Sequence, residues 1–158
     1  MMRRNEREVK DKNRILQILE ECKVCRLAFS DDHAPYIVPL NFGYETDGNM
    51  LSLYFHCAKE GRKIELIKRS SAAAFETDFF RRLVTADQAC GYTARYSSIT
   101  GFGDVEILTD SDQKLKGLCA VMRHYTGRAD WQISQAAIDA VCVLKLTVKE
   151  LSCKENLT

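Results

Sequence analysis

Two adjacent cations, Arg62 and Lys63, follow Gly61 where an alternating apolar segment gives way to a helical pattern. The first turn of a helix presents unpaired N–H groups, and the helix dipole favours negative charge there. A guanidinium beside an ammonium also suits the oxygens of a phosphate. These residues could therefore bind an anion. A solvated surface helix is the alternative interpretation, and on this short stretch alone it is the simpler one.

The seven cysteines do not have the spacing of a disulfide framework or of a zinc site. Cys22 and Cys25 form a C-x-x-C pair, but this pair would close a helix and open a strand, the reverse of a thioredoxin-like turn. Structural roles are expected for the cysteines, with metal or redox chemistry as the alternative. No Ser-His-Asp set and no pair of carboxylates placed for hydrolysis is recognised.

Length and composition favour one globular domain spanning residues 1–158, because 46% of the residues are hydrophobic. A net charge of +1 gives no basic footprint for nucleic acid. No apolar run approaches the roughly 18 residues of a membrane span. No signal-peptide core follows Arg3 and Arg4. We therefore expect a cytoplasmic protein that binds neither nucleic acid nor membranes.

Alternating apolar residues outnumber helical patterns along the chain, so a mainly β protein with peripheral helices is predicted. The closely spaced strands favour an antiparallel sheet, most simply a small barrel with helices at its gaps. Asp11 is the expected N-cap of the first helix, and Gly127 is expected to end the third. The predicted helices are 12–22, 60–69, a segment that begins near Thr109 and Asp112, and 134–140. The predicted strands are 24–30, 35–44, a segment from 51 to about 57, 72–79, 94–108 and 141–151, with 80–91 as a loop.

Three local features refine this pattern. Pro39 lies inside the predicted strand 35–44, which favours an edge strand or a bulge because proline cannot donate a ladder hydrogen bond. Gly101 and Gly103 share one face of their strand and would let a helix, a strand or a flat ligand approach closely. The third helix is expected to bury the face that carries its larger apolar residues, namely Leu115, Leu118, Cys119 and Met122.

Four motifs in order, "PYIVPLNFGY", "LYFHCAKEGRKIELI", "YSSITGFGDVEIL" and "MRHYTG", resemble the pyridoxamine 5′-phosphate oxidase-like flavoproteins. The branch that they resemble most contains nitroimidazole-resistance reductases, and the resemblance runs from about residue 3 to 155. It implies a flavin-binding split barrel, which is an antiparallel Greek-key barrel, and a homodimer with FMN at the interface.

The resemblance also implies roles for individual residues. Arg62 and Lys63 would bind the FMN phosphate with the help of backbone N–H groups near Gly61, and Ser97 and Ser98 would offer hydroxyls to the phosphate or ribityl chain. Seven further residues would line the flavin: His56, Cys57 and Ala58 at the phosphate end, and Val38, Pro39, Leu40 and Asn41 beneath the isoalloxazine ring. Many relatives have serine in place of Cys57, and a thiol is the weaker hydrogen-bond donor.

The implied activity is that of an FMN-dependent oxidoreductase, in which a nicotinamide donor reduces the flavin and a small nitro-aromatic or quinone accepts the electrons. No side chain would be indispensable as an acid or base. Two alternatives remain open: an FMN carrier or sensor without turnover, and a haem-binding protein with His56 or His124 as axial ligand. Trp131 could stack on the flavin or pack in the core or an interface.

Overall fold

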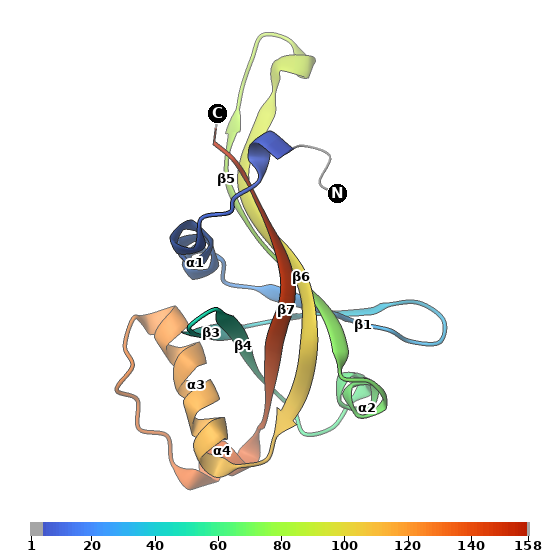
Figure 1. Cartoon of the computed structure of the whole chain (residues 1–158), viewed down its shortest axis with the longest axis vertical. Helices are drawn as coiled ribbons and strands as arrows, with labels where there is room; N and C mark the ends of the chain where they lie inside the picture. The colour runs from blue at the N-terminus through green and yellow to red at the C-terminus, as the bar shows by residue number, and fades with distance from the viewer. Residues whose placement is uncertain (1–4, 158) are drawn as a thin grey trace.

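The computed structural model describes residues 5–157, so that Arg3 and Arg4 lie outside the described residues. Strands dominate this part of the chain (Figure 1). The helices are α1 (Lys12–Glu21), α2 (Arg62–Arg69), α3 (Ser111–Thr126) and α4 (Gln135–Ala140), with 3₁₀ turns at η1 (Asn5–Arg7) and η2 (Ala89–Gly91). The strands are β1 (Cys25–Phe29), β2 (Tyr36–Leu40), β3 (Phe42–Asp47), β4 (Met50–Cys57), β5 (Ala72–Val84), β6 (Thr93–Leu108) and β7 (Cys142–Asn156). None of the helices described here is long and apolar enough to span a bilayer.

All neighbouring strands pair antiparallel, in the order β2-β1-β5-β6-β7-β4-β3. The two edge strands β2 and β3 are consecutive in sequence and only Asn41 separates them. Since one residue cannot cross a flat sheet of seven strands, the sheet must curl until its edges approach each other. Within residues 5–157 no ladder joins these edges. This is the predicted split-barrel architecture.

The prediction of one continuous strand over 35–44 is therefore wrong in detail. The chain leaves one edge of the sheet at Leu40 and enters the other edge at Phe42. Pro39 fits this arrangement because β2 pairs on one side only, with β1, where Pro39 lies opposite Arg26. The expectation that proline marks an edge strand is thus confirmed, and its missing N–H leaves no gap in the interior of the sheet.

The close approach expected at Gly101 and Gly103 is made by strand β7 and by a core aromatic ring. A Cβ atom at Gly103 would lie 2.1 Å from the carbonyl oxygen of Thr147. At Gly101 it would lie 2.4 Å from the carbonyl oxygen of Glu150 and 2.7 Å from the ring of Phe75. The β6–β7 register shifts beside Gly103, so the glycines allow a local bend where the two long strands cross the core.

Helix α3 packs on β3 and β4 through small residues. A Cβ at Gly43 would lie 2.3 Å from the backbone of Ala120, and one at Gly117 would lie 2.9 Å from the ring of Tyr54. Because these glycines admit the helix, the buried face differs from the predicted one, and the four larger residues are only half-buried. The buried residues of α3 are Gly117, Ala120, Val121 and His124.

The ends of α1 and α3 follow ordinary capping chemistry. The carboxylate of Asp11 accepts a hydrogen bond from Arg14 N at 2.7 Å, as predicted. At α3 the N-cap is Asp110, which accepts from Gln113 N at 2.9 Å, so the predicted cap at Thr109 is one residue too early. Gly127 ends α3 with a φ of 73°, a left-handed conformation that favours glycine.

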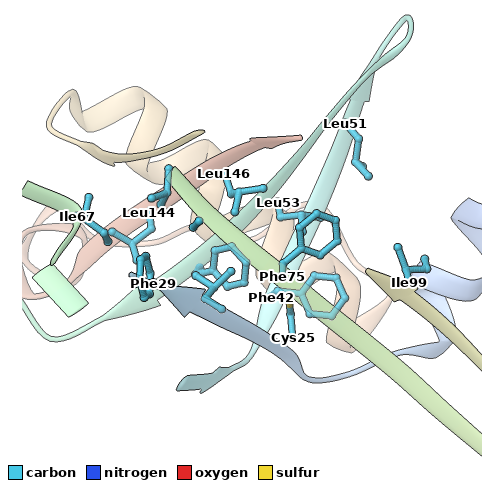
Figure 2. Packing of buried hydrophobic residues seen from close by; sticks show 14 of the residues in the cluster. Cys25, Phe29, Phe42, Leu51, Leu53, Ile67, Phe75, Ile99, Leu144 and Leu146 are labelled. Carbon is cyan, nitrogen blue, oxygen red and sulfur yellow. The ribbon is translucent and has the colours of Figure 1, made fainter. Parts of the chain in front are cut away.

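Core side chains from six strands meet inside the curled sheet, and Figure 2 shows Phe42, Leu53 and Phe75 gathered there. The rings of Phe42 and Phe55 lie 6.5 Å apart, and both residues are fully buried. Each such side chain contributes roughly 1.5–3 kcal/mol through burial. The core thereby fixes the positions of the strands that carry the candidate site.

Strands β5 and β6 continue beyond the core as a two-stranded arm (Figure 1). The segment 80–84, predicted as part of a loop, belongs to β5 because it pairs with β6 on both sides of a register shift between Phe80 and Arg82. The adjacent charged residues Arg81 and Arg82 obscure the strand pattern of this segment in the sequence. β7 likewise runs to Asn156, five residues past the predicted end, because it pairs with β6 as far as Tyr96. Large apolar residues of the arm are exposed, namely Phe79, Phe80, Leu83 and Tyr92.

Candidate anion and cofactor site

Helix α2 begins immediately after Gly61, which serves as its N-cap residue. Gly61 has a φ of 125° and a ψ of 169°, a conformation that residues with a Cβ rarely adopt. It contributes no side-chain cap, and the first intrahelical bonds come from Ile64 and Glu65 to its carbonyl. The N–H groups at the start of α2 are therefore available to an anion. We call Gly61, Arg62 and Lys63 the α2 N-terminal site.

Arg62 reaches back over the turn between β1 and β2. Its Nε donates to Asp31 Oδ2 at 2.7 Å, and its Nη2 forms an ion pair with the same oxygen. The guanidinium carbon lies 5.3 Å from the ring centroid of Tyr36 on β2. Half of the Arg62 side chain remains exposed, whereas the side chain of Asp31 is largely covered. These contacts fix the guanidinium beside the start of α2 and leave one side of it open to solvent.

The local charges favour the ionised form of the carboxylate on which Arg62 is anchored. The backbone N–H of Asp32 and then the guanidinium of Arg62 hold the pKa of Asp31 below its ordinary value. Arg69, at the other end of α2, also binds the turn, with an ion pair to Asp32 at 2.8 Å. The β1–β2 turn and α2 are thus joined by complementary charges at both ends of the helix.

Three more of the predicted residues lie at the same end of the sheet. β4 ends with His56, which is exposed, and Cys57, which is half-buried; Ala58 follows in the exposed connection to α2. Burial raises the pKa of the Cys57 thiol to about 11, and the nearby positive charge of Lys63 opposes this rise. Lys63 has no ion-pair partner among the described residues. The structure therefore groups this strand end with the α2 N-terminal site.

The four predicted residues from Val38 to Asn41 occupy β2 and the residue after it. Val38 and Leu40 pack against the core, whereas Pro39 and Asn41 are exposed. The same edge strand carries Tyr36, which contacts Arg62. Pro39 and Asn41 thus leave an exposed surface at this sheet edge, on the face of β2 opposite Tyr36, and a flat ligand could lie against it.

Ser97 and Ser98 are not brought to the α2 N-terminal site within one chain. Ser98 lies opposite Asp78 on β5, six residues or about 20 Å along the strand from the Ala72–Asp104 pair, which follows the C-terminal end of α2. Ser97 is buried and its hydroxyl donates to Glu155 at 2.8 Å. Arg81 Nε donates to the same hydroxyl at 3.2 Å. In one chain, Ser97 therefore belongs to an ionic cluster near the arm.

His124 is a core residue. Only 2% of it is exposed, and its Nδ1 lies 2.7 Å from the carbonyl oxygen of Phe42. Its ring packs edge-on against Phe42 and Tyr44. An axial-ligand role would require this packing to open. The Trp131 indole Nε1 donates to Thr126 Oγ1 at 3.1 Å, and the Arg128 guanidinium lies 4.7 Å from the ring centroid, so the ring contacts residues at the end of α3.

The cysteine arrangement matches the structural interpretation of the C-x-x-C pair. Cys22 and Cys25 are fully buried, and all seven cysteines are free thiols. Burial raises the pKa of both thiols. No metal-ligating group of histidine, cysteine or carboxylate side chains is found in residues 5–157.

Sequence reasoning missed the residues that hold Arg62 in place. Asp31 and Tyr36 precede it by 31 and 26 positions, and the sequence "DDH" of the first turn reads only as a turn. The available sequence signal is the adjacent pair Asp31 and Asp32 together with the two arginines of α2. Matching the carboxylates to the arginines, however, requires knowing that the β1–β2 hairpin lies beside α2. A cavity of about 690 Å³ between α3 and the β3–β4 hairpin is lined by none of the predicted site residues.

Comparisons with known proteins agree with this architecture. Residues 11–155 match the family model described as pyridoxamine 5′-phosphate oxidase. A proposed 5-nitroimidazole antibiotic resistance protein from Bacteroides thetaiotaomicron is 34% identical; the match covers 94% of this chain and 86% of that one, with a TM-score of 0.80. A comparison with curated proteins found no match.

Two more distant structures share the fold. The flavocytochrome Anf3 from Azotobacter vinelandii is 19% identical, with 100% of this chain and 73% of that one covered and a TM-score of 0.80. A FAD- and haem-binding protein from Mycobacterium smegmatis is 20% identical, with 96% and 74% covered and a TM-score of 0.80. Because the family model spans nearly the whole chain, this protein belongs to the pyridoxamine 5′-phosphate oxidase family.

Proposed function

We propose that the protein is an FMN-binding oxidoreductase that transfers electrons from a nicotinamide donor to a small nitro-aromatic or quinone acceptor. The observation that carries the proposal is the α2 N-terminal site, where an uncapped helix start, an anchored guanidinium and an unpaired ammonium converge. A phosphate dianion satisfies all three. The exposed residues at the β2 edge, Pro39 and Asn41, provide a surface for the flavin ring.

Bound FMN would supply the redox chemistry, and the chain would bind and orient it. Gly61 leaves room and free N–H groups for the phosphate, while Arg62 and Lys63 provide its counter-charges. His56 is exposed next to this site and can donate a hydrogen bond to a ligand. No acid or base of this chain is required for electron transfer. Support for flavin chemistry comes from the relatives, one described as a flavocytochrome and another as a FAD- and haem-binding protein.

A homodimer with the flavin at its interface forms part of the proposal. Phe80 is 58% exposed and Leu83 is 53% exposed on the arm, and such apolar surface favours association. The proposed dimer also offers a way for Ser98 of one subunit to approach a flavin bound at the α2 N-terminal site of the other. Within a single subunit these two regions are far apart along β5.

The visible absorption spectrum of the purified protein, recorded before and after addition of FMN and desalting, tests the proposal. Two flavin bands that survive desalting are the expected result. A protein that retains no FMN would contradict it. Anaerobic addition of reduced nicotinamide then separates an enzyme from an FMN carrier, because only the enzyme bleaches the bound flavin and is reoxidised by a nitro-aromatic or a quinone.

Haem binding is a second candidate, favoured by the exposure of His56 beside the α2 N-terminal site. A Soret band after haem addition that is lost in His56→Ala and retained in His124→Ala would support it. Loss of the band in neither variant would exclude histidine ligation by these two residues. FMN and haem titrations of the same preparation show which ligand binds more tightly.

A further inference from the structure

Cys57 and Cys142 lie directly opposite each other on neighbouring strands. They are the last register pair between β4 and β7, where the two strands run antiparallel. Residues paired in this way have Cα atoms about 4.5 or 5.5 Å apart, and their side chains project from the same face of the sheet. Both distances fall within the range of about 4.4–6.8 Å that disulfides require. The backbone already has a geometry that a disulfide can join.

The two thiols are also close enough for Cys142 to influence the ionisation of Cys57. Burial has the largest effect on the pKa of Cys57, and the charge of Lys63 opposes it. The neighbouring Cys142 thiol raises this pKa further. Cys57 is half-buried and Cys142 is 7% exposed, so Cys57 is the more accessible thiol. Both are unoxidised in this structure. The pair differs from a lone cysteine because each thiol has a defined partner.

A small cavity reaches Cys142 but is not lined by Cys57. It has a volume of about 250 Å³ and is lined by Cys142 together with Lys59, Lys68 and Lys114, which lie on the α2 connection, α2 and α3. Three ammonium groups at its lining favour an approaching reagent that carries carboxylates. Glutathione disulfide combines such carboxylates with an exchangeable S–S bond. The cavity thus provides charge complementarity for a peptide-like disulfide beside Cys142, while the more exposed Cys57 is the thiol that the reagent meets first.

We propose that Cys57 and Cys142 form a thiol–disulfide pair that an anionic low-molecular-weight disulfide oxidises to an intramolecular cross-strand disulfide. The Cys57 thiolate attacks one sulfur of the reagent, which forms a mixed disulfide and releases one thiol. The Cys142 thiolate then attacks Cys57 Sγ, which forms the protein disulfide and releases the second thiol. Two protein thiols are oxidised, the reagent gains two electrons, and the two protons pass to the released thiolates.

The other cysteines provide internal comparisons. Cys90 is exposed and has no cysteine opposite it in the β5–β6 arm, so it can form a mixed disulfide but not an intramolecular one. Cys22 and Cys25 are fully buried and lack access to a reagent. The raised pKa of Cys57, about 11, keeps most of it protonated at neutral pH. Exchange is therefore expected to be slow and to quicken in mildly alkaline buffer.

Peptide mapping tests the proposal on the full chain without added flavin, because FMN bound at the neighbouring α2 N-terminal site would shield Cys57. The protein is incubated with glutathione disulfide, remaining thiols are alkylated, and a tryptic digest is analysed by mass spectrometry without reduction. Cleavage after lysine and arginine places Cys57 in the peptide 27–59 and Cys142 in the peptide 129–145, each without another cysteine. A cross-linked 27–59/129–145 species that disappears after reduction is the expected result, while Cys90 carries glutathione.

Two variants test the order of attack. In Cys142→Ser the resolving thiol is absent, so Cys57 should accumulate as a stable glutathione mixed disulfide. In Cys57→Ser no cross-link should form, and Cys142 should remain largely alkylated. Alkylated thiols at both positions in the unaltered chain, together with glutathione on Cys90, would overturn the proposal. So would a persistent mixed disulfide at Cys57 beside a free Cys142 thiol. Neither outcome depends on flavin binding, so a failed flavin site would leave the result readable.

Discussion

Asp31 and Arg62 are joined by a hydrogen bond of 2.7 Å between Oδ2 and Nε, although 31 positions separate them in the sequence. The bond connects the β1–β2 turn to the first residue of α2. It holds a carboxylate where a ligand phosphate is proposed to bind. The same contact therefore orients the guanidinium and competes with an anionic ligand for it, and the first two predictions separate these effects.

Arg62→Ala should weaken FMN binding by about 10-fold or more, because a charge-assisted hydrogen bond contributes about 1.5–3 kcal/mol. Titration of flavin fluorescence measures the change. Arg69→Ala is the matched control, since Arg69 forms an ion pair with Asp32 at the other end of the same helix. Unchanged affinity in Arg62→Ala would remove this residue from the site.

Asp31→Asn should strengthen FMN binding, because it removes a negative charge beside the phosphate while an amide oxygen can still accept from Arg62. The gain should be larger at low ionic strength, where the charge is less screened. Binding of riboflavin, which lacks the phosphate, is the control and should change little. Weaker FMN binding in Asp31→Asn would mean that orienting the guanidinium outweighs the repulsion.

Gly61→Ala should lower the free energy of unfolding by about 1–3 kcal/mol, because a φ of 125° strains any residue with a Cβ. It should also weaken FMN binding, since relaxing the strain moves the first N–H groups of α2. Denaturant unfolding and flavin titration measure the two effects. Gly48→Ala, at a φ of 60° in the β3–β4 turn, is expected to lose stability without losing affinity.

Acid should destabilise the fold partly through Glu155, whose hydrogen bond from Arg14 holds its pKa below the ordinary value of 4.5. A lowered folded-state pKa stabilises the protein above pH 4.5, and this contribution is lost as the pH falls through the folded-state value. Glu155→Gln should therefore be less stable than the parent at neutral pH, with the difference shrinking in acid. Denaturant midpoints over this range measure it, and a constant difference would contradict the assignment.

Phe80→Glu should weaken the proposed homodimer, because it places a charge on the exposed apolar surface of the arm. Sedimentation velocity over a range of protein concentrations should show a shift towards monomer. Met50→Glu changes an exposed apolar residue in the β3–β4 hairpin and is the control. A parent protein that is monomeric with full flavin occupancy would contradict the interface.

Much of the site could be anticipated because it is local. Gly61, Arg62 and Lys63 are consecutive, and the change from an alternating to a helical pattern places them at a helix start. Proline lacks a backbone N–H and glycine lacks a Cβ, whatever their surroundings. An edge strand at Pro39 and a close approach at Gly103 could therefore be predicted.

Tertiary pairing decided what periodicity could not. The buried face of α3 follows from the contact of Gly43 with the helix backbone, not from the largest apolar residues of the helix. Segment 80–84 is a strand because β6 pairs with it, despite its charges. The partner of Arg62 and the opposition of Cys57 to Cys142 depend on the placement of hairpins and on strand register. The sequence by itself determined the local elements and the helix start at Gly61, since these depend on neighbouring residues. Only the folded sheet decided which distant residues meet, because strand register and sheet closure are properties of the whole chain.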